Sequence, residues 1–167
     1  MAQLTDLLEA NRSAVQDLLE AADNAGGVWT DPRAPGKWSP QQLVEHVALV
    51  LEAGADTVAG RPTRLPTLPR FVRPIVRGLF FNRVVRTGRF PNAKTNKEMN
   101  PSSGPATPAE ARARLEAACE TFERECYAGA EGGDTITSTA FGEVALDDYV
   151  RFMELHTRHH LEQMPHH

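Results

Sequence analysis

Three histidines occupy positions from which they could bind one metal ion together. His156 and His160 are four residues apart, so on a helix they share one face and lie about one turn apart. The residues at helical spacing before them, Tyr149 and Met153, predict that this face is buried. His46 lies in the register of the apolar residues of an earlier helical segment. We therefore expect three imidazoles to point into a helical core from two helices.

The chemistry of a buried imidazole favours metal binding at these positions. Such a ring loses its contacts with water and needs a partner for each nitrogen, and charging it in the core costs still more. A neutral imidazole nitrogen is a good ligand for Zn²⁺, Ni²⁺ or Fe²⁺, and three protein ligands leave a coordination position open for chemistry. A divalent metal ion bound by His46, His156 and His160 would satisfy these nitrogens. The alternative is three core histidines that are satisfied by hydrogen bonds.

Four amphipathic helices are expected to position these side chains. They are predicted at about 4–22, 40–59, 108–127 and 146–164, with no convincing strand pattern in competition. Ser39 followed by Pro40 is a typical helix start, and Thr107 with Glu110 forms a capping box. The pattern predicts an all-α four-helix bundle, and the long connections predict at least one crossover.

The composition fits one soluble domain over residues 1–167. The chain is 41% hydrophobic and 24% charged, it has no apolar run of about 20 residues, and we expect no signal peptide. Cys119 and Cys126 are two helical turns apart, which is about 10 Å and too far for a disulfide. We therefore expect a reduced protein in the cytoplasm.

Residues 61–106 are an irregular, proline-rich and partly helical insertion between the second and third predicted bundle helices, with Arg70–Val85 as a candidate short helix. Residues 61–90 hold eight arginines and no acidic residue, so the rest of the chain carries a net charge of −12. One hypothesis is a lid in which Arg73 and Arg77 bind an anionic small-molecule substrate. The alternative is a solvated basic face that pairs with the acidic remainder. We expect neither nucleic acid nor a membrane as a partner.

Both ends of the predicted bundle resemble the DinB/YfiT-like superfamily. Lys37-Trp38-Ser39-Pro40, followed by His46, is similar to the opening of that superfamily's second helix. The stretch from Phe141 to Gln163 is similar to its last helix, with the pattern H-x-x-H-H-x-x-Q. Members are four-helix bundles with one histidine from helix two and two from helix four around a metal, which implies the same three ligands here.

The resemblance also implies supporting roles and a range of activities. Gln163 and His159 are expected beside the ligands, where they would orient them, and Trp38 matches a recurrent aromatic that contacts substrate or plugs the helix entrance. Relatives include metal-dependent hydrolases and thiol-dependent transferases or isomerases that use mycothiol or bacillithiol. The alternative function is a non-catalytic metal-binding, stress-response or ligand-binding protein. We allow for a homodimer, although the sequence shows no exposed apolar stripe that would specify one.

Overall fold

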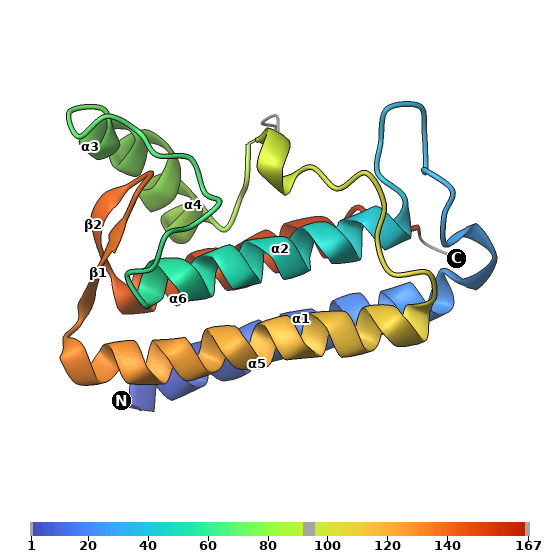
Figure 1. Cartoon of the computed structure of the whole chain (residues 1–167), viewed down its shortest axis with the longest axis horizontal. Helices are drawn as coiled ribbons and strands as arrows, with labels where there is room; N and C mark the ends of the chain where they lie inside the picture. Colours follow the sequence, from blue (N-terminus) through green and yellow to red (C-terminus); the bar gives the residue numbers. More distant parts are fainter. Residues whose placement is uncertain (1, 92–95, 166–167) are drawn as a thin grey trace.

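The computed structural model describes residues 2–91 and 96–165, and four long helices dominate it (Figure 1). They are α1 (Ala2–Asn24), α2 (Pro40–Val58), α5 (Pro108–Gly132) and α6 (Leu146–Leu161). Helix α1 packs chiefly on α6, and α2 packs chiefly on α5, around one apolar core. The prediction of an all-α bundle is confirmed.

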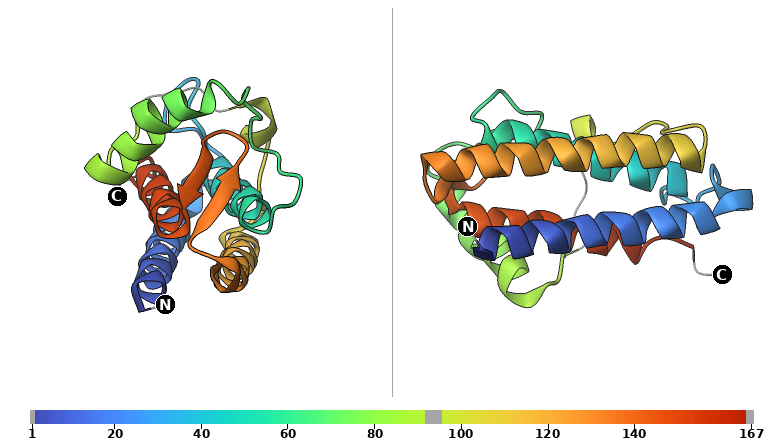
Figure 2. Two further views of the ribbon diagram at one scale, coloured as in Figure 1. Left: turned by 90° about the vertical axis from the view of Figure 1, so that its left-hand side faces the viewer. Right: turned by 90° about the horizontal axis from the view of Figure 1, so that it is seen from below.

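The directions of the four long helices require a crossover. In Figure 1, α1 and α6 run one way along the bundle, and α2 and α5 run the other way. Since α2 and α5 are parallel, the chain between them must return along the full length of the bundle. The insertion makes this return, and it covers the side of the bundle where α2 and α6 face outward (Figure 2).

Local signals set the helix ends. The Ser39 side chain accepts from the backbone N–H of Gln42, whose side chain accepts from the Ser39 N–H in return, so α2 begins with a complete capping box. Helix α5 continues five residues past the predicted end, to Gly132. Helix α6 ends at Leu161 instead of 164, and a turn follows that buries Met164.

A β-hairpin links α5 to α6, and the expectation that no strands form was wrong. Strand β1 (Thr135–Ser138) pairs antiparallel with β2 (Gly142–Ala145). Ile136 lies opposite Val144, and both side chains are buried at the end of the bundle. The strands are four residues long, too short for an alternating pattern to stand out in the sequence.

The insertion is more ordered than its composition suggests. It contains α3 (Arg73–Val76), the π-helical turn η2 (Arg77–Phe81) and α4 (Asn82–Thr87), which together form one helical run. This run is close to the predicted Arg70–Val85 helix. A short turn, η3 (Lys97–Met99), follows, and residues 92–95 of the predicted loop lie outside the described part of the chain. None of the described helices combines the length and hydropathy needed to cross a bilayer.

Hydrogen bonds hold residues 96–106 against the first half of α2. Side chains at the start of α2 hold this loop through three contacts: Trp38 Nε1 donates to Asn100 Oδ1, Gln41 Nε2 to the Gly104 carbonyl and Gln42 Nε2 to the Pro101 carbonyl. The loop approaches so closely that a Cβ added at Gly104 would lie 2.3 Å from the Gln41 carbonyl oxygen. Only glycine fits between these two backbones.

We expect Gly104→Ala to lower the free energy of unfolding by about 1–3 kcal/mol, since the clash is with backbone that can move only if the loop leaves α2. Urea denaturation would measure this loss. Gly26→Ala is the matched control, because a Cβ there meets no atom within 4 Å, and its effect should stay within about 0.5 kcal/mol. Equal stability of the two variants would show that the loop is not fastened at Gly104.

Candidate metal centre

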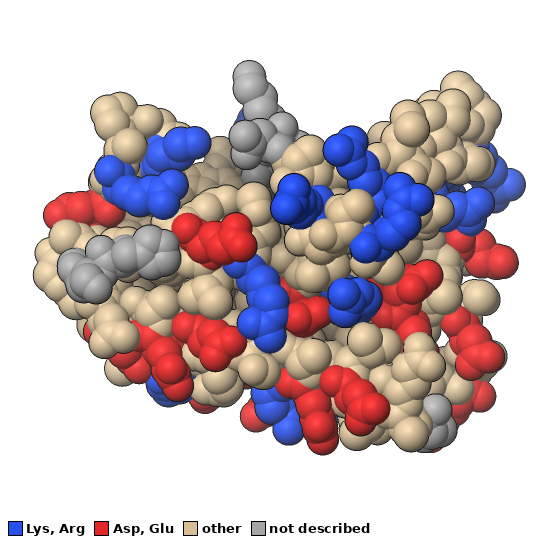
Figure 3. Space-filling model, turned by 180° about the vertical axis from the view of Figure 1, so that it is seen from behind, with Lys and Arg blue, Asp and Glu red and all other residues tan. Residues whose placement is uncertain are grey.

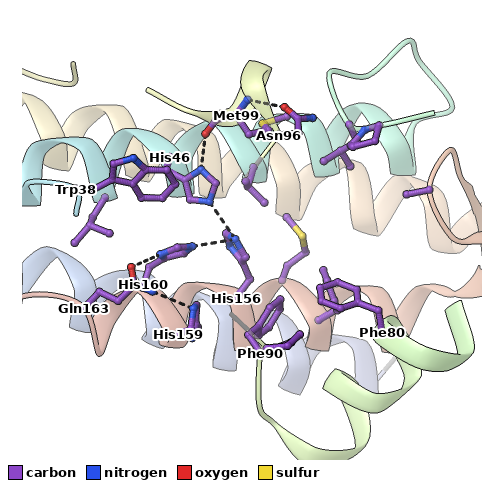
Figure 4. Close-up of a pocket in the computed structure, with 18 of the residues that line it drawn as sticks. Trp38, His46, Phe80, Phe90, Asn96, Met99, His156, His159, His160 and Gln163 are labelled. Atoms are coloured by element: carbon purple, nitrogen blue, oxygen red, sulfur yellow. Dashed lines mark hydrogen bonds between the residues drawn. The ribbon is translucent and has the colours of Figure 1, made fainter. Parts of the chain in front are cut away.

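The three predicted histidines converge between α2 and α6 (Figure 4). His46 comes from α2, and His156 and His160 come from α6, one turn apart. One ligand nitrogen from each ring lies within 4.8 Å of the others. His46 and His160 are buried, and His156 is partly exposed. These three residues could hold a metal ion.

Hydrogen bonds on the far side of two rings fix which nitrogen faces the centre. His46 Nδ1 donates to the Met99 carbonyl oxygen at 2.7 Å, because a carbonyl can only accept. We assign the same tautomer to His160, with Nδ1 donating to the amide oxygen of Gln163 at 3.2 Å. Both rings then turn an unprotonated Nε2 toward the Nε2 of His156, at 3.2 and 3.1 Å.

This donor set fits a divalent cation. His156 has at most one proton on Nε2, so it cannot satisfy both facing lone pairs with a full hydrogen bond. Zn²⁺ binds imidazole nitrogens at about 2.0–2.1 Å, which places tetrahedral ligands about 3.3 Å apart, close to the observed spacings. Among the residues that the structure describes, no fourth His, Cys, Asp or Glu belongs to this group. A metal held here would keep an open position.

Gln163 and His159 lie where the sequence placed them, beside the three histidines. Gln163 accepts from His160 through its amide oxygen and donates through its amide nitrogen to His159 Nε2 at 2.9 Å. His159 in turn stacks on Phe90, with ring centroids 5.5 Å apart. The chain His159–Gln163–His160 therefore fixes the orientation of one candidate ligand from the α6 side.

The Met99 carbonyl likewise fixes the orientation of His46, the candidate ligand on α2. This contact was not predicted from the sequence. Met99 lies in the insertion over residues 61–106, which was expected to be irregular. The signal that could have found this turn is Asn96, whose side chain accepts from the backbone N–H groups of Glu98 and Met99 as a helix cap does. Nothing in the sequence indicates that the Met99 carbonyl reaches His46.

Burial keeps the imidazoles neutral. It lowers the pKa of His46 to about 4, although the hydrogen bond to Met99 opposes this shift. Burial and the neighbouring rings lower the pKa of His160 to about 3. The pKa of His156 is also well below its usual range, first through burial and then through the charges that its neighbours would carry. The nitrogens are therefore available to a cation at neutral pH without losing a proton.

The histidines line one end of a cavity of about 940 Å³. Its walls come from α2, α6, the hairpin and the insertion, and they are mostly apolar. Four phenylalanines in contact with one another line the wall that leads from the histidines, where Phe90 adjoins His156, to the far end: Phe80, Phe90, Phe141 and Phe152. The cavity is large enough for a drug-sized organic molecule.

One of the three predicted substrate-binding residues lines the cavity, and the other two do not. Trp38 lines the cavity, and its ring lies 4.6 Å from that of His46. Arg73 and Arg77 are not among the lining residues, since their guanidinium groups donate to the carbonyls of Leu68 and Glu143. The basic side chains at the cavity are instead those of Arg33 and Lys37, in the loop before Trp38, which the sequence did not single out.

The cavity offers no serine, threonine or cysteine nucleophile among the described residues. Within the described part of the chain its lining holds no Ser, Thr, Cys or Asp, and its one carboxylate is that of Glu162. Cys119 and Cys126 are buried free thiols on α5, and burial raises the pKa of the Cys119 thiol to about 12. No serine, threonine or cysteine of the described chain is therefore placed to act as a nucleophile at the histidines.

The low pKa of His46 makes a prediction about acid stability. The unfolded chain takes up this proton near pH 6.5 and the folded chain only near pH 4, so unfolding becomes easier as the pH falls through this window. His46 alone should account for a loss of about 3 kcal/mol between pH 7.5 and 4. Urea denaturation of metal-free protein would measure it. His46→Gln should flatten the profile, and a profile of unchanged slope would contradict the assignment.

Comparisons with known proteins agree with this arrangement at the level of the family. No curated protein and no solved structure shows significant similarity to the chain. The family model of the DinB superfamily, however, matches residues 7–164, which include most of α1, the whole of α2, α5 and α6, and the three histidines. With nearly its whole length matched, this chain belongs to the DinB superfamily.

Proposed function

We propose that this protein is a metal-dependent enzyme whose centre is held by His46, His156 and His160. One observation carries the proposal: three preoriented imidazole nitrogens, with no fourth ligand among the described residues, line a cavity of about 940 Å³. A structural zinc site closes with four ligands and is usually shut off from space of this kind. An open position that faces a cavity suits catalysis.

The residues of the chain would hold and shape this centre. Met99 and Gln163 keep the Nδ1 atoms of His46 and His160 occupied, so that both Nε2 atoms stay directed inward. A divalent ion such as Zn²⁺, Ni²⁺ or Fe²⁺ would supply Lewis acidity there, to activate water or a thiol or to polarise a carbonyl group. The phenylalanine side chains make much of the cavity wall apolar, and electrostatic interactions beside apolar walls are stronger than in bulk water.

The lining also suggests the class of reaction and of substrate. Since the cavity has no Ser, Thr or Cys, the nucleophile would be water, as in a hydrolase, or a low-molecular-weight thiol, as in an S-transferase or isomerase. The four phenylalanines favour an apolar or aromatic body, and Arg33 and Lys37 favour an anionic end. We propose a small anionic organic substrate in a reducing, cytoplasmic setting, where Cys119 and Cys126 remain thiols.

Metal content tests the centre directly. Mass spectrometry should find about one divalent ion per chain, and His46→Ala and His160→Ala should lose it. Tyr127→Ala is the control, because it removes an exposed aromatic side chain of α5 and should keep the metal. Histidines 166 and 167, which lie outside the described residues, should be changed to Asn throughout so that they cannot bind metal. Metal that survives both Ala substitutions would refute the site.

Turnover separates an enzyme from a protein that only binds metal. Metal-loaded protein should convert members of a panel of aryl esters and thiol-reactive electrophiles, tested with and without a low-molecular-weight thiol. Gln163→Ala should weaken metal affinity by about tenfold or more, with activity regained at higher metal concentration. Metal that raises the melting temperature of the protein but supports no turnover across the panel would favour the non-catalytic alternative.

A further inference from the structure

The helical run of the insertion carries an apolar ridge on its outer side. Phe71, Ile75 and Leu79 are spaced four residues apart, and their exposed fractions are 79%, 59% and 73%. They are three of the four large hydrophobic side chains that are exposed in the described part of the chain. The exposed stripe could not be recognised in the sequence, because apolar residues spaced four apart look the same on a buried helix face and on an exposed one. We call these three residues the apolar ridge.

The ridge is not needed to pack the run against the bundle. The opposite side of the same run packs against the bundle, since Phe81 and Val84 are buried in the core and Phe80 packs against it. The run therefore has apolar residues on two sides, one facing the protein and one facing out. Exposed apolar residues gathered in this way mark interaction surfaces in soluble proteins.

Unpaired arginines surround the ridge. Of the eight arginines in residues 61–90, only Arg61 forms a salt bridge within the described part of the chain. Arg70 adjoins the ridge directly, and Arg83 and Arg86 continue its exposed face along α4. Figure 3 shows basic side chains toward the upper edge and most acidic ones in the lower half. The uncharged projection at its upper right lies at the end of the molecule where Figure 1 places α3.

We propose that the apolar ridge and its arginines bind the surface of an anionic lipid membrane. Phe71, Ile75 and Leu79 would enter the interface between headgroups and acyl chains, and Arg70, Arg83 and Arg86 would lie among the anionic headgroups. The separation of charge over the molecule would orient it, with the acidic part of the bundle held away from the bilayer. This replaces the expectation that a membrane is no partner.

Charge argues against a second copy of the chain on this face. A two-fold dimer would place the same patch on both sides of the interface, so the unpaired arginines of one protomer would face those of the other. Headgroup phosphates neutralise these arginines instead. The ridge also projects from the surface as a convex helix, which suits insertion into a fluid interface.

The same run connects this surface to the cavity. Val76 and Phe80, on the inner side, line the cavity, and Phe71, Ile75 and Leu79 face outward from the same turns. A molecule with an apolar body could therefore pass between a bilayer and the cavity along one short helix. The membrane proposal itself needs neither metal nor turnover, so it stands or falls separately from the proposed function.

Vesicle cosedimentation with the full chain tests the proposal. Binding to phosphatidylcholine vesicles that contain about 30% phosphatidylglycerol should exceed binding to pure phosphatidylcholine by about tenfold or more. Raising NaCl from about 0.05 to 0.5 M should weaken it several-fold, because salt screens the arginines. The triple variant Phe71→Ser, Ile75→Ser, Leu79→Ser should lose about tenfold or more in affinity.

Two controls keep this experiment decisive. Tyr127→Ser removes the exposed aromatic of α5, on another face, and should change vesicle binding by less than about twofold. The melting temperature and metal content of the triple variant should match those of the wild type, because the three side chains are exposed. Wild-type protein that ignores anionic vesicles, or a triple variant that binds them as well, would overturn the proposal. So would a solution dimer that the triple variant abolishes.

Discussion

The hydrogen bond from His46 Nδ1 to the Met99 carbonyl is the contact on which the arrangement of the centre depends most. A buried imidazole must satisfy two nitrogens, and this bond satisfies one of them from the backbone. It can form only if residues 96–106 lie against α2, which explains why Trp38, Gln41 and Gln42 all hold that loop. The capping box, the loop and the histidine thus belong to one connected set of contacts.

His160, on α6, is oriented in a comparable way, but by side chains instead of the backbone. There a side-chain amide, Gln163, takes the place of the backbone carbonyl, and His159 holds that amide in turn. Both supports occupy an Nδ1 atom and direct an Nε2 atom inward. His156 has no such support among the hydrogen bonds described, so its ring orientation depends on packing against its neighbours, including Phe90. The centre is therefore held firmly at two rings and more loosely at the third.

The sequence predicted the bundle and the convergence of the histidines well, because both follow from helical periodicity. His156 and His160 share a face wherever a helix forms, and Ser39-Pro40 signals where the helix of His46 begins. The hairpin and the Met99 carbonyl were missed for a common reason. Neither the four-residue strands nor the three-residue turn is long enough to leave a periodic pattern. The contact of Met99 with His46 also joins residues 53 positions apart in the chain.

The arginine-rich segment shows where periodicity misleads. Its helical spacing was visible, but helical spacing alone does not tell the inner face from the outer one. Arg73 and Arg77 were expected at the substrate, yet they hold the Leu68 and Glu143 carbonyls, and the apolar residues divide between the core and the exterior. A sequence with two apolar faces gives the same pattern as a sequence with one broad buried face.

The separation of the histidines along the chain has a consequence for biosynthesis. His46 and His156 meet across 110 residues, and α6 is the last helix to leave the ribosome. While α1, α2 and α5 are being made, the nascent chain holds only one of the three imidazoles. An ion held by all three histidines could not template the early helices, whose packing relies on apolar contacts and on ion pairs such as Arg114–Glu52. Such an ion would bind only after α6 is made.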